Sequence, residues 1–209
     1  MYLLEAFVNL TFSDNGIETL LGKNAVGCFA SVLDDSRVCQ VLDDAWPKIV
    51  ELSLRVLGNM SINHDGKQEC IDNEVIKRSH AFLVNQPERS YEDALNTSLI
   101  LMSCSIHLDG KHQIVHADHN GSPYIICTMI NRLESSQYPD LRKNLIVALT
   151  NVAELPLGFE KITGQLIHKI QILDEVFGAR AVKPLHGFLP RLNDYDDTMS
   201  FSKKAQMIG

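Results

Sequence analysis

The chain has 209 residues, 45% of them hydrophobic and 22% charged, a composition typical of a folded domain or a short repeat array. Its 19 Lys and Arg are outnumbered by 26 Asp and Glu, and the net charge of −7 argues against nucleic acid or an anionic membrane as partner, because both attract basic clusters. The longest strongly apolar stretches, such as Leu99 to Ile106, are too short to span a bilayer. The 5 cysteines form no C-x-x-C pair, so we expect reduced, mostly buried thiols in a cytoplasmic protein.

Helical patterns follow one another from the first residue onward. Met1 begins directly in a long-helix pattern, so we expect an incomplete first repeat and association of the chain through this helix. Pro47 and Pro139 suit the first turn of two later long helices, because that turn does not need the missing N–H. Ser90, with Asp93 three residues on, predicts the start of another long helix through a capping box.

The other segments extend the helical prediction toward the end of the chain. The run from Tyr124 to Met129 fits a strand or a buried helix by periodicity alone, but its place in the repeat favours a helix. Phe177 to Leu192 predicts a final helical pair interrupted by prolines. Asn193 to Gly209 is polar, and we expect an extended tail that is ordered only by a partner.

Four glycines share one sequence environment and define an internal repeat. They recur at intervals of about 44 to 50 residues, close to the period of armadillo and HEAT repeats, at Gly16, Gly66, Gly110 and Gly158. The residue nine positions before each glycine is apolar: Phe7, Leu57, Leu101 and Leu149. The residue seven positions before is polar: Asn9, Asn59, Ser103 and Asn151. We expect each unit to contain a long helix, a tight turn where the glycine adopts a positive φ angle, and shorter helices.

Two stretches resemble the third helix of armadillo repeats, namely Val56-Leu57-Gly58-Asn59-Met60-Ser61 and Ala148-Leu149-Thr150-Asn151-Val152-Ala153. Two others resemble the turn into the next repeat, namely Asp65-Gly66-Lys67 and Asp109-Gly110-Lys111. Within this superfamily the chain is most similar to the armadillo-repeat proteins of ciliary radial spokes, in His64-Asp65-Gly66-Lys67-Gln68 and in the segment from Leu133 to Gly158. The resemblance implies an all-α fold, an armadillo/HEAT-like right-handed superhelical solenoid of about four repeats over residues 1–192, with the polar tail at 193–209.

The same resemblance implies a function. It points to a non-enzymatic structural scaffold of the axoneme, a radial spoke component that binds other spoke proteins within a large hetero-complex and needs no cofactor. The alternative is a soluble armadillo adaptor that binds extended peptides in its concave groove. No phosphate-binding glycine loop, nucleophile elbow or catalytic Cys-His pattern occurs in the sequence, and we expect no enzymatic activity.

The polar position of the repeat is the candidate binding site. In armadillo proteins the long helices line the concave groove, and an amide there can pair with both groups of a bound peptide backbone. We therefore predict a partner-binding groove with contributions from Asn9, Arg55, Asn59, Ser103 and Asn151. The competing interpretation is that these side chains bond to neighbouring backbone and stiffen the stack. Import adaptors carry a tryptophan four residues before each asparagine, a position held here by Glu5, Arg55, Leu99 and Val147, which disfavours binding of basic import signals.

A histidine cluster offers a weaker hypothesis. His112 and His116 stand four residues apart and could share a helix face, as metal ligands do, with His107 and His119 nearby. Because no ligand spacing of cysteine or acidic residues accompanies them, we expect surface and turn histidines and no metal site.

Overall fold

The computed structural model describes residues 2–34, 45–84, 90–116 and 125–166, and within these ranges every regular element is a helix. Four helices correspond to the long helix of each unit: α1 (Tyr2–Leu10), α5 (Trp46–Ile62), α8 (Tyr91–Cys104) and α11 (Pro139–Val152). A second helix follows each: α2 (Asp14–Leu21), α6 (His64–Asp72), α9 (Leu108–His116) and α12 (Pro156–Leu166). Third helices are α3 (Ala25–Asp34), α7 (Val75–Ser79) with the 3-10 turn η1 (His80–Leu83), and α10 (Ile125–Ser135).

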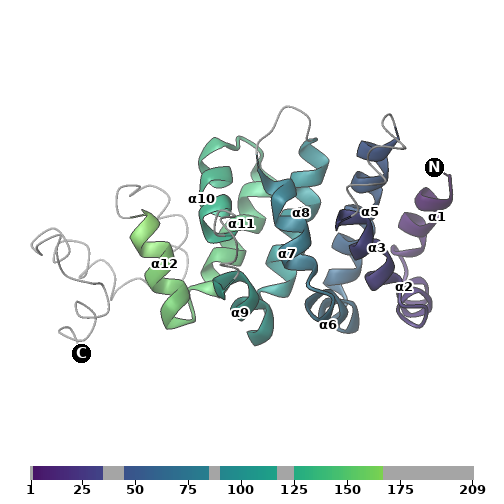
Figure 1. Cartoon of the computed structure of the whole chain (residues 1–209), viewed down its shortest axis with the longest axis horizontal. Coiled ribbons are helices and arrows are strands. Elements are labelled where there is room, and N and C mark those ends of the chain that lie inside the picture. The colour runs from purple at the N-terminus through teal and green to yellow at the C-terminus, as the bar shows by residue number, and fades with distance from the viewer. Residues whose placement is uncertain (1, 35–44, 85–89, 117–124, 167–209) are drawn as a thin grey trace, which may run out of the picture.

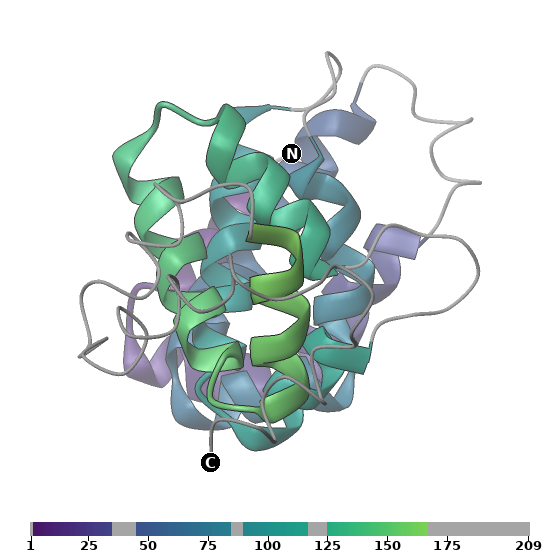
Figure 2. The ribbon, with the colours of Figure 1, turned by 90° about the vertical axis from the view of Figure 1, so that its left-hand side faces the viewer.

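Helices of the same kind lie beside one another in chain order. The long helices contact each other in the sequence α1, α5, α8, α11, and the second helices do so as α2, α6, α9, α12. Figure 1 shows this progression along the long axis, from purple at one end to green at the other. Seen from the α12 end in Figure 2, the later helices overlie the earlier ones. The all-helical expectation is therefore confirmed, and units about 44 to 50 residues apart are neighbours in space.

The predicted helix starts are confirmed where the structure describes them. Pro47 and Pro139 each stand in the first turn of their helix. Ser90 accepts a hydrogen bond from the Asp93 N–H, and the Asp93 carboxylate accepts one from the Ser90 N–H, which completes the capping box of α8. The run before Met129 is the helix α10. The predictions for 177–192 and 193–209 lie outside the described residues.

The repeated glycines work differently from the expectation. Each lies in the first turn of a second helix, not at a turn with positive φ, so that part of the prediction is wrong. A Cβ atom built on Gly110 would lie 2.0 Å from the carbonyl oxygen of Cys104, and one on Gly66 would lie 2.2 Å from that of Met60. Gly16 and Gly158 meet the end of their own preceding long helix in the same way. These glycines let two helix backbones touch where any side chain would keep them apart.

Positive φ angles occur later in the unit, between the second helix and the third helix. Asn24 (φ 54°) and Glu74 (φ 52°) both stand eight residues after the glycine, directly before the third helices α3 and α7. Asparagine tolerates this left-handed geometry better than most residues, whereas glutamate is strained in it. A left-handed residue thus stands at the same position in the first two units.

The apolar rows of the repeat form one continuous core. Leu57, Leu101 and Leu149, nine residues before their glycines, are fully buried, and Phe7 at the same position packs partly buried against the core. The thiols of Cys70 and Cys104 are buried as expected, but that of Cys28 is exposed. In the described part of the chain, no helix combines the length and apolar character needed to cross a membrane.

Polar side chains also join the second helices of successive units. Gln113 Nε2 donates a hydrogen bond to the Ile71 carbonyl at 2.8 Å, and Lys161 Nζ donates to the Val115 carbonyl at 2.7 Å. The donor stands three residues after its glycine in both cases, and the acceptor five residues after the glycine of the preceding unit. The same bond is therefore made twice by different residue types, which fixes how one unit sits on the next.

Candidate functional site

A groove of about 300 Å³ lies between the first two long helices, α1 and α5. Its lining residues are Glu5, Val8, Asn9, Phe12, Lys48, Leu52 and Arg55. Val8 and Leu52 are buried and give the groove an apolar floor, whereas the charged and amide side chains are exposed and lie along its sides. A concave surface with an apolar floor and a few polar groups at its rim is the usual form of a ligand or peptide site.

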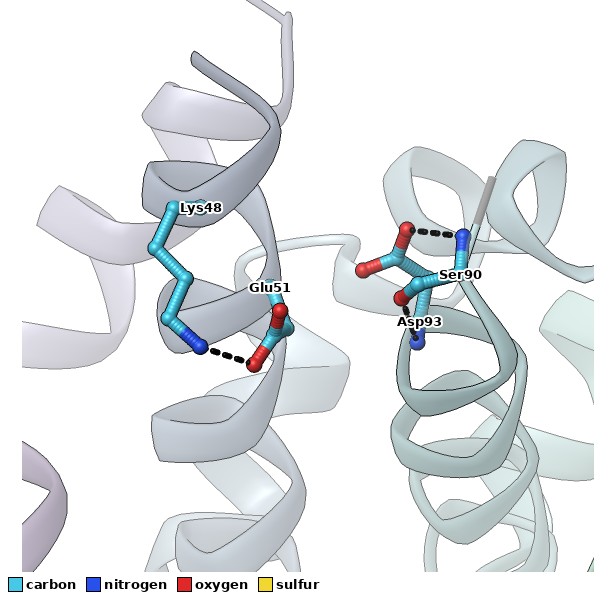
Figure 3. A network of polar contacts seen from close by, with 4 residues as sticks. All are labelled: Lys48, Glu51, Ser90 and Asp93. Atoms are coloured by element: carbon cyan, nitrogen blue, oxygen red, sulfur yellow. Dashed lines mark hydrogen bonds and ion pairs between the residues drawn. The ribbon is translucent and has the colours of Figure 1, made fainter. Parts of the chain in front are cut away.

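The charges of the groove are partly paired. Lys48 Nζ lies 2.6 Å from Glu51 Oε1 one turn along α5, and Figure 3 shows the two side chains reaching toward each other. Figure 3 also shows the capping box of Ser90 and Asp93 at the start of α8. Arg55 and Glu5 have no ion pair among those found in the described residues, so both charges face solvent in the groove. They can therefore meet a carboxylate and an amine of a bound segment at little desolvation cost.

Of the five residues predicted to form the partner-binding groove, the structure brings two together. Asn9 and Arg55 both line the groove and are exposed. Ser103 is only 2% exposed on α8. Asn59 and Asn151 are half-buried and are engaged within the chain. Partner binding by this set stays a prediction, and Asn9 and Arg55 are its accessible members.

The two half-buried amides bridge neighbouring units. Asn59 Nδ2 donates to Thr11 Oγ1 at 2.8 Å, and Asn151 Nδ2 donates to Ser105 Oγ at 3.0 Å. Each hydroxyl in turn donates a hydrogen bond to a helix carbonyl three residues back, at 2.6 Å for Thr11 and 2.7 Å for Ser105. Asn144 makes a third bridge of this kind, to Ser98 at 3.1 Å. These amides thus bond within the chain, as the competing interpretation expected, but to side-chain hydroxyls of the neighbouring unit and not to its backbone.

We expect Asn151→Ala to lower the free energy of unfolding by about 1 kcal/mol, because it removes a half-buried inter-unit hydrogen bond and leaves the Ser105 hydroxyl without this donor. Urea denaturation followed by circular dichroism measures the change. Asn131→Ala on the exposed face of α10 is the matched control and should leave stability within about 0.5 kcal/mol of the original. Equal losses for the two variants would contradict the bridging role.

An exposed apolar row was missed by the sequence analysis. Phe12, Ile62 and Ile106 stand four residues before their glycines and are 65%, 61% and 57% exposed. Leu108, two residues beyond Ile106, is 59% exposed. The recurrence of a large apolar side chain at this position is visible in the sequence. Its exposure is not, because the position falls where the long helix ends and helical periodicity stops applying.

The histidines do not gather as the sequence suggested. The His112 and His116 rings stack with centroids 5.8 Å apart, whereas the His107 ring lies 5.4 Å from that of His64. Burial, followed by Lys67 and His64, lowers the pKa of His107 and so favours its neutral form. No group of three or more potential metal ligands occurs among the residues that the structure describes, and His119 lies outside them.

Comparisons with known proteins leave the site to be judged on its own geometry. No protein-family model and no curated protein matches the chain.

Proposed function

We propose that the chain is an armadillo-type right-handed superhelical solenoid of about four repeats, extending over residues 1–192, and that it acts as a non-enzymatic scaffold for other proteins. The ordered rows of helices support the repeat architecture, because each unit contacts its neighbours along the chain. The observation that carries the scaffold role is the set of bonds fixing one unit on the next: the amide bridges of Asn59 and Asn151 and the side-chain-to-carbonyl bonds of Gln113 and Lys161. A stiffened stack presents a long surface at low entropic cost to binding.

The place of this scaffold is proposed from the resemblance of its His64–Gln68 and Leu133–Gly158 segments to radial spoke armadillo proteins. On this proposal the protein is a cytoplasmic component of the cilium or flagellum. There it binds other spoke subunits in a large hetero-complex, without cofactor, nucleic acid or membrane. The net charge of −7 agrees with partners that are proteins with basic surfaces.

Extraction of axonemes tests the proposal. Tagged protein in ciliated cells should remain with the axoneme after detergent removes the membrane, and should leave it only at high salt. A soluble cytoplasmic protein carrying the same tag is the control and should leave with the detergent. If the tagged chain leaves together with that control, it has no stable place in the axoneme and the scaffold proposal fails in this form.

The second candidate function is a soluble adaptor for extended peptides, and the groove between α1 and α5 favours it. An amide at Asn9, opposite charges at Glu5 and Arg55 and the apolar floor at Leu52 form a plausible site for a short segment. The variant Arg55→Glu tests this function without touching the inter-unit bridges. It should abolish peptide binding by an adaptor but leave axonemal retention of a scaffold unchanged.

A further inference from the structure

We propose that Phe12, Ile62, Ile106 and Leu108 form a docking row for a basic amphipathic helix of another protein. This inference names a surface and a partner chemistry that the scaffold proposal does not specify, and it does not depend on the axonemal location. The four side chains are between 57% and 65% exposed. Large apolar side chains scattered singly on a surface need no explanation, but recurrence at one position of three successive units is not scatter.

The position of the row follows from the fold. Phe12, Ile62 and Ile106 stand between a long helix and the second helix that follows it, in the short connection or, for Ile62, at the last residue of the long helix. Figure 1 shows the second helices α2, α6 and α9 in chain order along the lower edge of the molecule, where these connections lie. The row therefore follows the chain order of the units, with one apolar side chain from each of the first two units and two, Ile106 and Leu108, from the third. Phe12 also borders the groove between α1 and α5.

The spacing suits a helix. Packed neighbouring helices lie about 8–10 Å apart, and the second helices α2, α6 and α9 contact one another in that order. In an α-helix, residues seven apart share a face and are about 10.5 Å apart along the axis. One apolar side chain per heptad on a partner helix would then meet one member of the row after another. Helix-in-groove recognition uses apolar anchors at such intervals.

The charge beside the row selects a basic partner. Helices α2, α6 and α9 carry six carboxylates against two lysines, Lys67 and Lys111. Lys67 is only 8% exposed, and Lys111 forms an ion pair with Glu154. The accessible charges next to the row include the first-turn carboxylates Asp14, Asp65 and Asp109. Against them stands Arg55, which borders the same groove as Phe12, so the charge along the row as a whole is predominantly negative. The pKa of His107 is lowered by burial, which disfavours a positive charge on that ring beside the row.

The acidic residues in the first turns have a structural role of their own, because they complement the helix dipoles. The dipoles do not explain why isoleucine, leucine and phenylalanine are exposed beside them. An apolar strip with an acidic border matches a helix that carries Leu or Ile on one face and Lys or Arg on its flanks. Another copy of this chain is a poorer match, since the row would face the same acidic border.

Fluorescence anisotropy with the full chain tests the proposal. The probe is a fluorescein-labelled helical peptide of about three heptads, with Leu on one face and Lys on its flanks. It should bind, and Ile62→Gln combined with Ile106→Gln should weaken binding about tenfold or more, because both apolar anchors are lost. Glutamine adds no charge, so the electrostatic attraction is unchanged. Leu3→Gln, at a 69% exposed leucine of α1 outside the row, should bind as the original chain does.

Two further peptides and one variant separate the contributions. A scrambled peptide of the same composition, without an apolar face, and a peptide with Glu in place of Lys should both bind about tenfold more weakly or not at all. The variant Asp65→Asn with Asp109→Asn should weaken binding of the Lys peptide and reduce its dependence on salt. Thermal melts establish that each variant is folded.

Several outcomes would overturn the proposal. Equal binding by the Ile62→Gln/Ile106→Gln variant and the original chain would show that the row is not the docking site. Equal binding of the scrambled peptide would show that the interaction is general charge attraction and does not require an apolar face. A dimer in sedimentation that the double variant abolishes, together with no binding of the Lys peptide, would assign the row to a second copy of the chain. None of these results would decide the axonemal proposal, which rests on extraction.

Discussion

Gly110→Ala is expected to destabilise the protein by about 2–4 kcal/mol, a large effect for the addition of one methyl group. The added Cβ would lie 2.0 Å from the oxygen and 2.7 Å from the carbon of the Cys104 carbonyl. Both atoms belong to the backbone at the end of α8, so no side-chain rotation can relieve the clash and the two helices must separate. Urea denaturation monitored by circular dichroism measures the loss.

Gly164→Ala is the matched control, because Gly164 also lies in a second helix of the repeat, α12. A Cβ at Gly164, within α12, meets nothing within 4 Å. Alanine is the better helix former, so this variant should gain up to about 1 kcal/mol. The two substitutions are chemically identical and should differ in sign. A similar small change in both would mean that the backbone approach at Gly110 is not tight in solution.

Leu101→Ala is expected to cost about 2–5 kcal/mol, because it leaves a cavity in the continuous core. Leu101 is fully buried on α8, the long helix that packs between α5 and α11. Its truncation therefore opens a void in a helix that is covered by neighbouring units on both sides. A lower midpoint of thermal unfolding, with a lower urea midpoint and an unchanged urea slope, would identify the effect as lost packing.

Leu108→Ala serves as the control for the leucine series. Its side chain is 59% exposed, so truncation should change stability by no more than about 0.5 kcal/mol. The same variant is informative for the docking row, where it should weaken peptide binding without affecting the fold. A large loss of stability from Leu108→Ala would indicate that the side chain is covered in solution, for example by another copy of the chain.

The repeat frame could be predicted from the sequence because helix patterns are local. Apolar spacing, a proline at a first turn and the Ser90–Asp93 pair each act within a few residues, and all three reappear as helix starts or buried rows. The role of Gly110 could not be predicted in the same way. A glycine that adopts positive φ and a glycine that admits a neighbouring backbone look alike in a sequence, since both require only the absence of a side chain.

The candidate site was predictable only in part for a related reason. Asn9, Asn59 and Asn151 occupy one position of the repeat, yet Asn9 is exposed while the other two bond to a hydroxyl of the preceding unit. Those bonds join residues 48 and 46 positions apart, so they depend on how units pack. The residues that line the groove could not be predicted for the same reason, because Lys48 and Phe12 come together only when α1 lies against α5.

The close approach at the four glycines makes the angle between two successive helices independent of the exposed side chains. The angle between a long helix and the helix after it is set by backbone atoms, at Leu10, Met60, Cys104 and Val152, and not by the side chains that face solvent. Exposed residues can therefore be exchanged through evolution or by design without altering the angle between the two helices of a unit. Variants with different surfaces would then differ in surface chemistry but not in the arrangement of the helices that carry it.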